Sequence, residues 1–181
     1  MDEDLGSDFA RLVGDTRSRD AVRARVRERH LRDAAGADAT LLGIALDLAE
    51  EGAEVVVTTD MGRPVTGRIT LVSTDTLAVG MSYVPLRSVV TIRRPPGSRS
   101  VETPTGRRPA PRATTFAVLI GELALDRPRV AVAARGEPAV LTGELRRAGA
   151  DVMTLRLDGD PPVVAYVSLE SVSTVTLLAS G

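Results

Sequence analysis

Apolar residues follow a helical period in three stretches of the chain. The first two, residues 7–14 and about 20–35, predict a helical N-terminal arm whose second helix is rich in arginine and thin in apolar residues. The third stretch, residues 39–52, predicts an amphipathic helix that stops at Gly52. Its apolar stripe comprises Leu41, Leu42, Ala45, Leu48 and Ala49.

Between residues 55 and 86 apolar residues alternate with polar ones, which predicts short strands with one buried face. Gly62 lies at a turn, and Gly67 is expected to permit a sharp bend within a strand. One helix and five short strands are too few for a sandwich of two full sheets, so a small, strongly bent barrel fits better. The positions expected to face its core are Val55, Val57, Ile69, Leu71, Leu77, Val79, Met81, Val84 and Leu86.

The pattern of a helix followed by short strands occurs twice. Residues 65–69 (VTGRI) match residues 141–145 (LTGEL) at an offset of 76, with Gly143 in the place of Gly67. Residues 83–89 match residues 166–172 at an offset of 83, and the change of offset is one insertion around residues 158–162. The sequence therefore predicts a mainly β protein of the α+β class, with two tandem small barrels that are each preceded by a helix.

Four segments follow from these patterns. Residues 93–112 carry six arginines, one acidic residue and five prolines, so they cannot bury enough surface to fold alone. The predicted organisation is a helical arm (1–36), a first helix-plus-barrel repeat (37–93), a basic proline-rich linker (94–112) and a second repeat (113–181).

Composition narrows the possible chemistry. The chain has no Cys and one His, His30, which excludes thiol catalysis and structural zinc sites of the Cys/His kind. All 23 basic residues are Arg, which is typical of a high-GC bacterial genome, and without Lys there is no phosphate-binding P-loop. We therefore expect no enzyme, and no catalytic, cofactor-binding or metal-binding residues. No apolar run reaches about 18 residues and the N-terminus is acidic, so a cytoplasmic protein without a membrane span is expected.

The repeated motifs resemble those of the Sm-like superfamily, which includes Sm, LSm and Hfq-type proteins. In each repeat an alternating apolar strand is followed by a turn glycine and then by Gly-x-(Ile/Leu), as in Gly67-Arg68-Ile69 and Gly143-Glu144-Leu145. Residues 81–90 are similar to the closing two strands of the Hfq type. The resemblance covers about two thirds of the chain, extends to tandem proteins of high-GC bacteria, and implies Sm-like or SH3-like barrels whose edge strands pair between neighbours.

The base-binding pocket of that superfamily is not matched. Ser73 and Gly149 stand where the family has an aspartate, and Asp75 and Asp151 follow two residues later. Asp75 and Asp151 are instead expected to accept backbone N–H bonds in their turns. The resemblance thus implies the fold without its uridine pocket.

Two kinds of residue could contact nucleic acid. Tyr83 and Tyr166 recur at the same position and could stack bases, although half-buried core tyrosines are the alternative interpretation. Arginines of the N-terminal helix and the linker could contact phosphates, although a solvated helix and a charged, extended linker explain them as well. The candidates are Arg23, Arg27, Arg93, Arg94, Arg107 and Arg108.

The leading hypothesis is a non-catalytic binding or scaffold protein that self-associates through barrel edge strands, because exposed edges must be paired or protected. The two tandem barrels could satisfy one another's edges within the chain, or assemble further into dimers or rings. The alternative is an RNA- or DNA-binding regulator that uses the arginine-rich helix and linker. The sequence identifies no protein partner other than a second copy.

Overall fold

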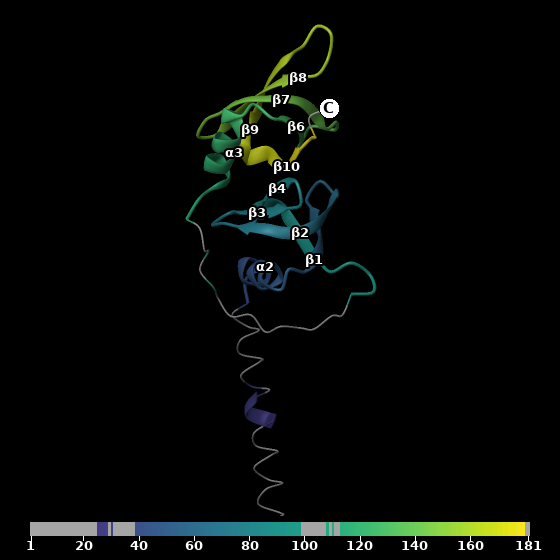
Figure 1. Ribbon diagram of the computed structural model, residues 1–181, viewed down its shortest axis with the longest axis vertical. Helices are drawn as coiled ribbons and strands as arrows, with labels where there is room; N and C mark the ends of the chain where they lie inside the picture. Colours follow the sequence, from purple (N-terminus) through teal and green to yellow (C-terminus); the bar gives the residue numbers. More distant parts are fainter. Residues whose placement is uncertain are drawn as a thin grey trace, which may run out of the picture. The chain divides into compact units, whose positions relative to one another are not determined.

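The same order of elements occurs twice in the computed structural model, which describes residues 25–28, 30, 39–98, 108, 110 and 113–179 (Figure 1). We call these two series the first half and the second half. The first half comprises α2 (Leu41–Glu50), β1 (Glu54–Thr59), β2 (Pro64–Val72), β3 (Thr76–Val79), β4 (Ser82–Pro85), the 3₁₀ turn η1 (Leu86–Ser88) and β5 (Val89–Arg93). The second half comprises α3 (Phe116–Leu125), β6 (Arg129–Ala134), β7 (Leu141–Ala148), β8 (Val152–Leu157), β9 (Val164–Ser168), η2 (Leu169–Ser171) and β10 (Val172–Leu177).

Both halves belong to one compact unit. Within the arm, residues 25–28 and 30 are helical and exposed, in agreement with the helix predicted there. The predicted helix over residues 7–14 and the rest of the second one lie outside the described residues. None of the helices that the structure describes is long and apolar enough to cross a membrane.

The ten strands form one antiparallel sheet in the order β5-β1-β2-β3-β4-β10-β6-β7-β8-β9. The prediction of a mainly β protein with preceding helices is confirmed, but the prediction of two tandem small barrels is not, because the strands form one open sheet. Among the described strands no pairing joins β4 to β5 or β9 to β10, so neither half closes on itself. The reason is that β4 pairs with β10 of the other half, which satisfies the backbone groups that closure would have used.

Each half has its own hydrophobic core, and a capped helix contributes to it. Thr40 and Thr115 cap α2 and α3 by accepting hydrogen bonds from the backbone N–H groups of Gly43 and Val118, respectively. The core of the first half comprises Ala45, Leu46, Val55, Val57, Ile69, Val72, Leu77, Val79 and Val84. The core of the second half comprises Phe116, Ile120, Ala124, Val130, Val132, Ala134, Leu145, Met153, Leu155, Val167, Leu169, Val172 and Val175.

Two details of the predicted core are wrong. The stripe on α2 included Leu41, which is exposed, and omitted Leu46, which is buried. Met81 was expected inside, but it lies in the turn between β3 and β4 and is exposed. At Leu41 and Met81 the period was continued to the first residue of a helix and beyond the end of a strand.

The glycines of the repeated motif lie where neighbouring strands approach most closely. Gly67 has φ +154°, and a Cβ there would lie 3.1 Å from the backbone nitrogen of Gly80. A Cβ at Gly143 would lie only 2.2 Å from the carbonyl oxygen of Arg156. A shift of register follows each glycine. The strands β2 and β7 therefore bend sharply near Gly67 and Gly143, residues that have no side chain to clash with the neighbouring strand.

Candidate interaction site

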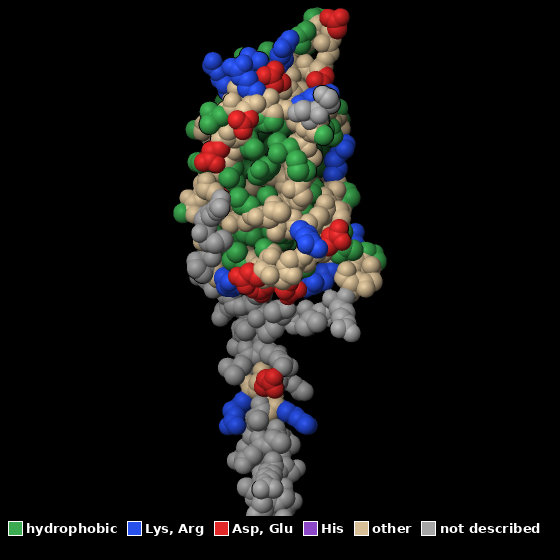
Figure 2. Space-filling model, viewed as in Figure 1, with side chains coloured by type: hydrophobic (Ala, Val, Ile, Leu, Met, Phe, Trp, Pro, Cys, Tyr) green, Lys and Arg blue, Asp and Glu red, His purple; other side chains and the backbone are tan. Residues whose placement is uncertain are grey.

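The contact between the two halves, which we call the junction, begins with β4 and β10. Tyr83 lies opposite Val175 and Ser82 opposite Thr176 in this antiparallel pair. The Ser82 and Thr176 hydroxyl oxygens lie 2.8 Å apart, and the backbone N–H of Leu177 donates to the Met81 carbonyl at 2.9 Å. Hydrophobic side chains are visible across this region on the face shown in Figure 2.

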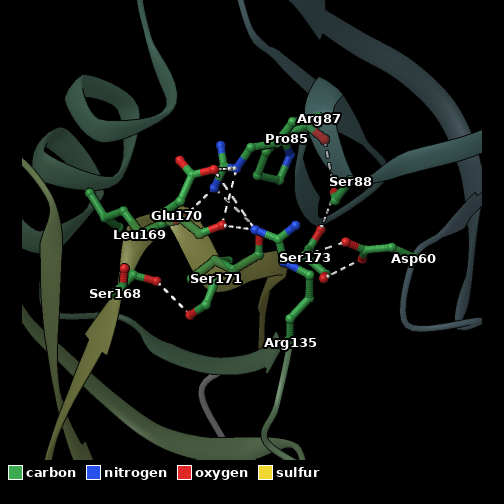
Figure 3. Close-up of polar contacts among 11 residues, drawn as sticks. Asp60, Pro85, Arg87, Ser88, Arg135, Ser168, Leu169, Glu170, Ser171 and Ser173 are labelled. Carbon is green, nitrogen blue, oxygen red and sulfur yellow. Dashed lines mark hydrogen bonds and ion pairs between the residues drawn. The ribbon is translucent and has the colours of Figure 1, made fainter.

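Arg87 on η1 reaches across the junction to the backbone of η2 (Figure 3). Its guanidinium donates to the carbonyl oxygens of Leu169, Glu170 (3.2 Å) and Val172 (3.4 Å), and it lies 3.6 Å from the Glu170 carboxylate. The same guanidinium lies 5.7 Å from the centre of the Phe116 ring. A planar guanidinium suits this set of contacts, since it offers five donors and stacks on aromatic rings.

Buried serines and a second ion pair complete the junction. The Ser88 hydroxyl lies 2.8 Å from the Pro85 carbonyl oxygen and 3.0 Å from that of Ser173. Ser173 donates from its own hydroxyl to the Asp60 carboxylate at 2.5 Å, and the Arg135 guanidinium lies 3.7 Å from that carboxylate. These buried polar groups have partners across the contact, which makes the relative position of the halves specific.

Asp75 links β3 to the helix of the other half. Its carboxylate accepts the backbone N–H of Phe116, the first residue of α3, at 2.8 Å, and the hydroxyl of Thr76 at 2.8 Å. The sequence predicted an acceptor within its own turn, whereas the N–H group belongs to the second half. A carboxylate at this place also interacts favourably with the N-terminal end of a helix.

The sheet ends at two edges that no described strand covers, β5 and β9. Val90 on β5 and Val164 and Tyr166 on β9 are exposed, and Tyr166 retains 76% of its accessible surface. The two tyrosines of the sequence repeat therefore differ, because Tyr83 is half-buried and packs against the core of the second half. Unpaired edges with apolar side chains are surfaces to which another strand can add.

The structure places the predicted phosphate-binding arginines in different surroundings. Arg27 and Arg93 are exposed, whereas Arg94 forms an ion pair with Glu51. Arg108 lies 2.7 Å from the Asp47 carboxylate and 2.5 Å from that of Glu50, both on α2. The two remaining candidates, Arg23 and Arg107, lie outside the described residues.

Hydrogen bonds from Arg108 lower the pKa of the Glu50 carboxyl below its ordinary value. Because the pKa is lowered on folding, this contact stabilises the structure above the ordinary carboxyl pKa and is lost as the pH falls through the lowered one. We expect Arg108→Ala to raise the pKa of Glu50 toward that of a free glutamate, as measured by NMR titration of the carboxyl carbon. Arg129→Ala is the matched control, since Arg129 pairs with Asp158. An unchanged Glu50 pKa in Arg108→Ala would show that Arg108 does not hold the carboxylate.

The described residues carry little further chemistry. Among them no group of three acidic or histidine side chains could hold a metal ion, and His30 is exposed. A shallow groove of about 770 Å³ crosses the junction, and Arg63 is its one charged lining residue. Its lining comprises Arg63, Pro64, Val65, Thr66, Val79, Gly80, Met81, Ser82, Ala131, Ala133, Val140, Thr174 and Thr176.

Comparison of the chain with protein-family models, with curated proteins and with solved structures finds no match. The function is therefore inferred from the geometry of the junction and of the sheet edges. Apart from Asp75, the charged residues of the junction were not among the residues singled out from the sequence. A signal for them existed, because opposite charges occupy corresponding places in the two repeats, Arg87 against Glu170 and Asp60 against Arg135.

Proposed function

We propose that this chain is a non-catalytic binding or scaffold protein that self-associates through the edge strands of its sheet. The observation that carries the proposal is the pair of edges, β5 and β9, that no described strand covers, with apolar side chains exposed on both. Soluble proteins usually protect such edges with charges, prolines, bulges or a covering segment. A strand from a second copy would satisfy the backbone groups and cover the apolar side chains together.

The order of elements also supports kinship with the Sm-like small barrels. Each half has a helix followed by five strands, and the motif glycine bends the second of them. In this proposal each half is an open Sm-like barrel. The pairing of β4 with β10 between the halves replaces the pairing that would close each barrel.

The alternative, a nucleic-acid-binding regulator, draws less support from the described residues. Arg94 and Arg108 already contact carboxylates of α2, so binding a phosphate would require breaking these ion pairs. Tyr166 is available for stacking, but Tyr83 is engaged in the junction. Edge-strand association needs no such rearrangement.

Self-association is tested by the mass of the full chain in solution. Light scattering after size-exclusion chromatography should give a mass that is a multiple of 19.1 kDa. This mass should stay constant or increase as the protein concentration is raised. Tyr166→Lys should shift the protein toward a single chain, because a lysine on the edge disfavours strand addition. Leu125→Lys, at another exposed apolar position on α3, is the matched control and should leave the mass unchanged. A concentration-independent single chain for the unmodified protein would overturn the proposed function.

A further inference from the structure

We infer that the groove across the junction binds a small amphipathic carboxylate, a free molecule with one negative head group and an unbranched apolar chain. The groove measures about 770 Å³, which lies within the range of about 300–1,000 Å³ typical of small-molecule sites. None of the described residues that line it belongs to the edge strands β5 and β9. The inferred ligand site therefore goes beyond the proposed self-association.

The floor of the groove is the outward face of β6 and β10. Ala131 and Ala133 line the groove and alternate along β6 with the core residues Val130 and Val132. Ala133 lies opposite Thr174 of β10, and these two residues are only 4% and 7% exposed although neither belongs to the core. The floor is thus recessed below the surface of the sheet.

Comparison of the two halves explains the open space. The residues opposite the motif glycines of β2 and β7 are equivalent, so Ala131 and its partner Thr176 correspond to Val56 and its partner Arg93. Both positions carry shorter side chains in the second half than in the first. An unbranched apolar chain would occupy the volume that these shorter side chains leave open.

The backbone of the floor has no free groups to offer a peptide. In the strand order, β4, β10 and β6 each have a neighbouring strand on both sides. The hydroxyl groups of Ser82 and Thr176 are also in contact with each other, with their oxygens 2.8 Å apart. An extended peptide seated here would leave its own N–H and C=O groups without partners, which is costly. The floor therefore suits an apolar chain better than a peptide.

Arg63 gives the groove its charge. It lies directly before β2 and is the one charged residue among those that line the groove. No carboxylate of the described residues pairs with its exposed guanidinium. A guanidinium binds a carboxylate through two parallel hydrogen bonds, so a ligand with this head group complements the groove. A cationic head group would be repelled.

Met81 supplies an adaptable apolar wall. It lies in the turn between β3 and β4, lines the groove and is 59% exposed. Methionine is unbranched and polarisable, and it adjusts its shape to apolar surfaces. An apolar chain in the groove would cover part of this side chain. The Met81 methyl group is therefore a reporter of binding.

A ligand in this groove would contact both halves of the chain. The lining residues of β2 and β4 belong to the first half, and those of β6 and β10 belong to the second half. A ligand that binds only the joined halves stabilises their contact by mass action. Binding is thus expected to slow hydrogen exchange of the amides of β4 and β10.

Titration of the full chain with octanoate at neutral pH tests the inference, with the methionine methyl groups labelled for NMR. The Met81 methyl signal should shift in a saturable way, whereas that of Met153, which is fully buried in the core of the second half, should not. Octanol should bind more weakly than octanoate, because it lacks the charge. Octyltrimethylammonium, which has the opposite charge, should produce no shift.

Two variants separate the head group from the apolar chain. Arg63→Gln should weaken octanoate binding by up to about fivefold, the effect of one exposed ion pair, and leave octanol binding unchanged. Arg147→Gln is the matched control, since Arg147 is an exposed arginine of β7 outside the groove, and it should bind octanoate normally. Ala131→Leu extends a side chain into the groove and should abolish binding of both octanoate and octanol.

The unmodified protein alone can overturn the inference. No saturable shift of the Met81 signal with octanoate, or an equal shift with octyltrimethylammonium, would exclude an amphipathic carboxylate as the ligand. Equal affinity of Arg63→Gln and the unmodified protein for octanoate would show that Arg63 does not recognise the head group. None of these results depends on the mass of the protein in solution, so this inference and the proposed self-association fail independently.

Discussion

Replacing Gly143 by alanine is expected to destabilise the protein strongly, and by more than the same change at Gly67. A Cβ at Gly143 would lie 2.2 Å from the Arg156 carbonyl oxygen and 2.7 Å from the Leu157 Cα. Both atoms belong to the backbone of β8, so no side-chain rotation relieves the clash, and β7 and β8 must separate. Overpacking typically costs about 1–3 kcal/mol, and we expect the upper end of this range or beyond.

The free energy of unfolding in urea measures this effect. Gly121→Ala is the matched control, because it makes the same change in α3, where the added Cβ has no neighbour within 4 Å outside the backbone of its own helix. In a helix, alanine is favoured over glycine by about 0.5–1 kcal/mol, so the control should be more stable than the unmodified protein. Equal stability of the two variants would contradict the close approach of β7 and β8.

Arg87→Ala is expected to have the second largest effect, because it removes several contacts across the junction at once. The variant loses the donors to three carbonyl oxygens of the second half and the contact with the Phe116 ring. Since the side chain is partly exposed, we expect a loss of about 2 kcal/mol in the free energy of unfolding. Arg87→Lys should recover only part of this, because an ammonium group has the charge without the planar fork.

The matched control is Arg147→Ala, which removes an exposed arginine from β7. An exposed substitution of this kind usually changes stability by no more than about 0.5 kcal/mol. Hydrogen exchange would show where the loss occurs, and the amides of η2 and β10 should lose protection in Arg87→Ala. If the two alanine variants were equally stable, Arg87 would not hold the halves together.

Patterns within a short window predicted local structure well. The helical period, the glycine stop and the alternating residues predicted α2 and the short strands because these features depend on neighbours a few residues apart. Such a window does not predict which distant residues contact the end of a helix or the edge of a strand. Leu41 and Phe116 occupy equivalent places and are both apolar, yet one is exposed and the other buried. Asp75 likewise was assigned to its own turn, although its carboxylate accepts an N–H from a residue 41 positions away.

The sequence by itself determined the fold class, the twofold repetition of a helix with five strands and the positions of the glycines at which strands bend. These properties follow from periodicity and from the steric demands of single residues. Only the tertiary structure decided that β4 pairs with β10 instead of closing a barrel, that Asp60 and Arg87 meet their opposite-charged counterparts, and that no described strand covers β5 or β9. The physical reason is that several edges present similar backbone donors and acceptors, so the choice among them depends on side chains that lie far apart in the sequence.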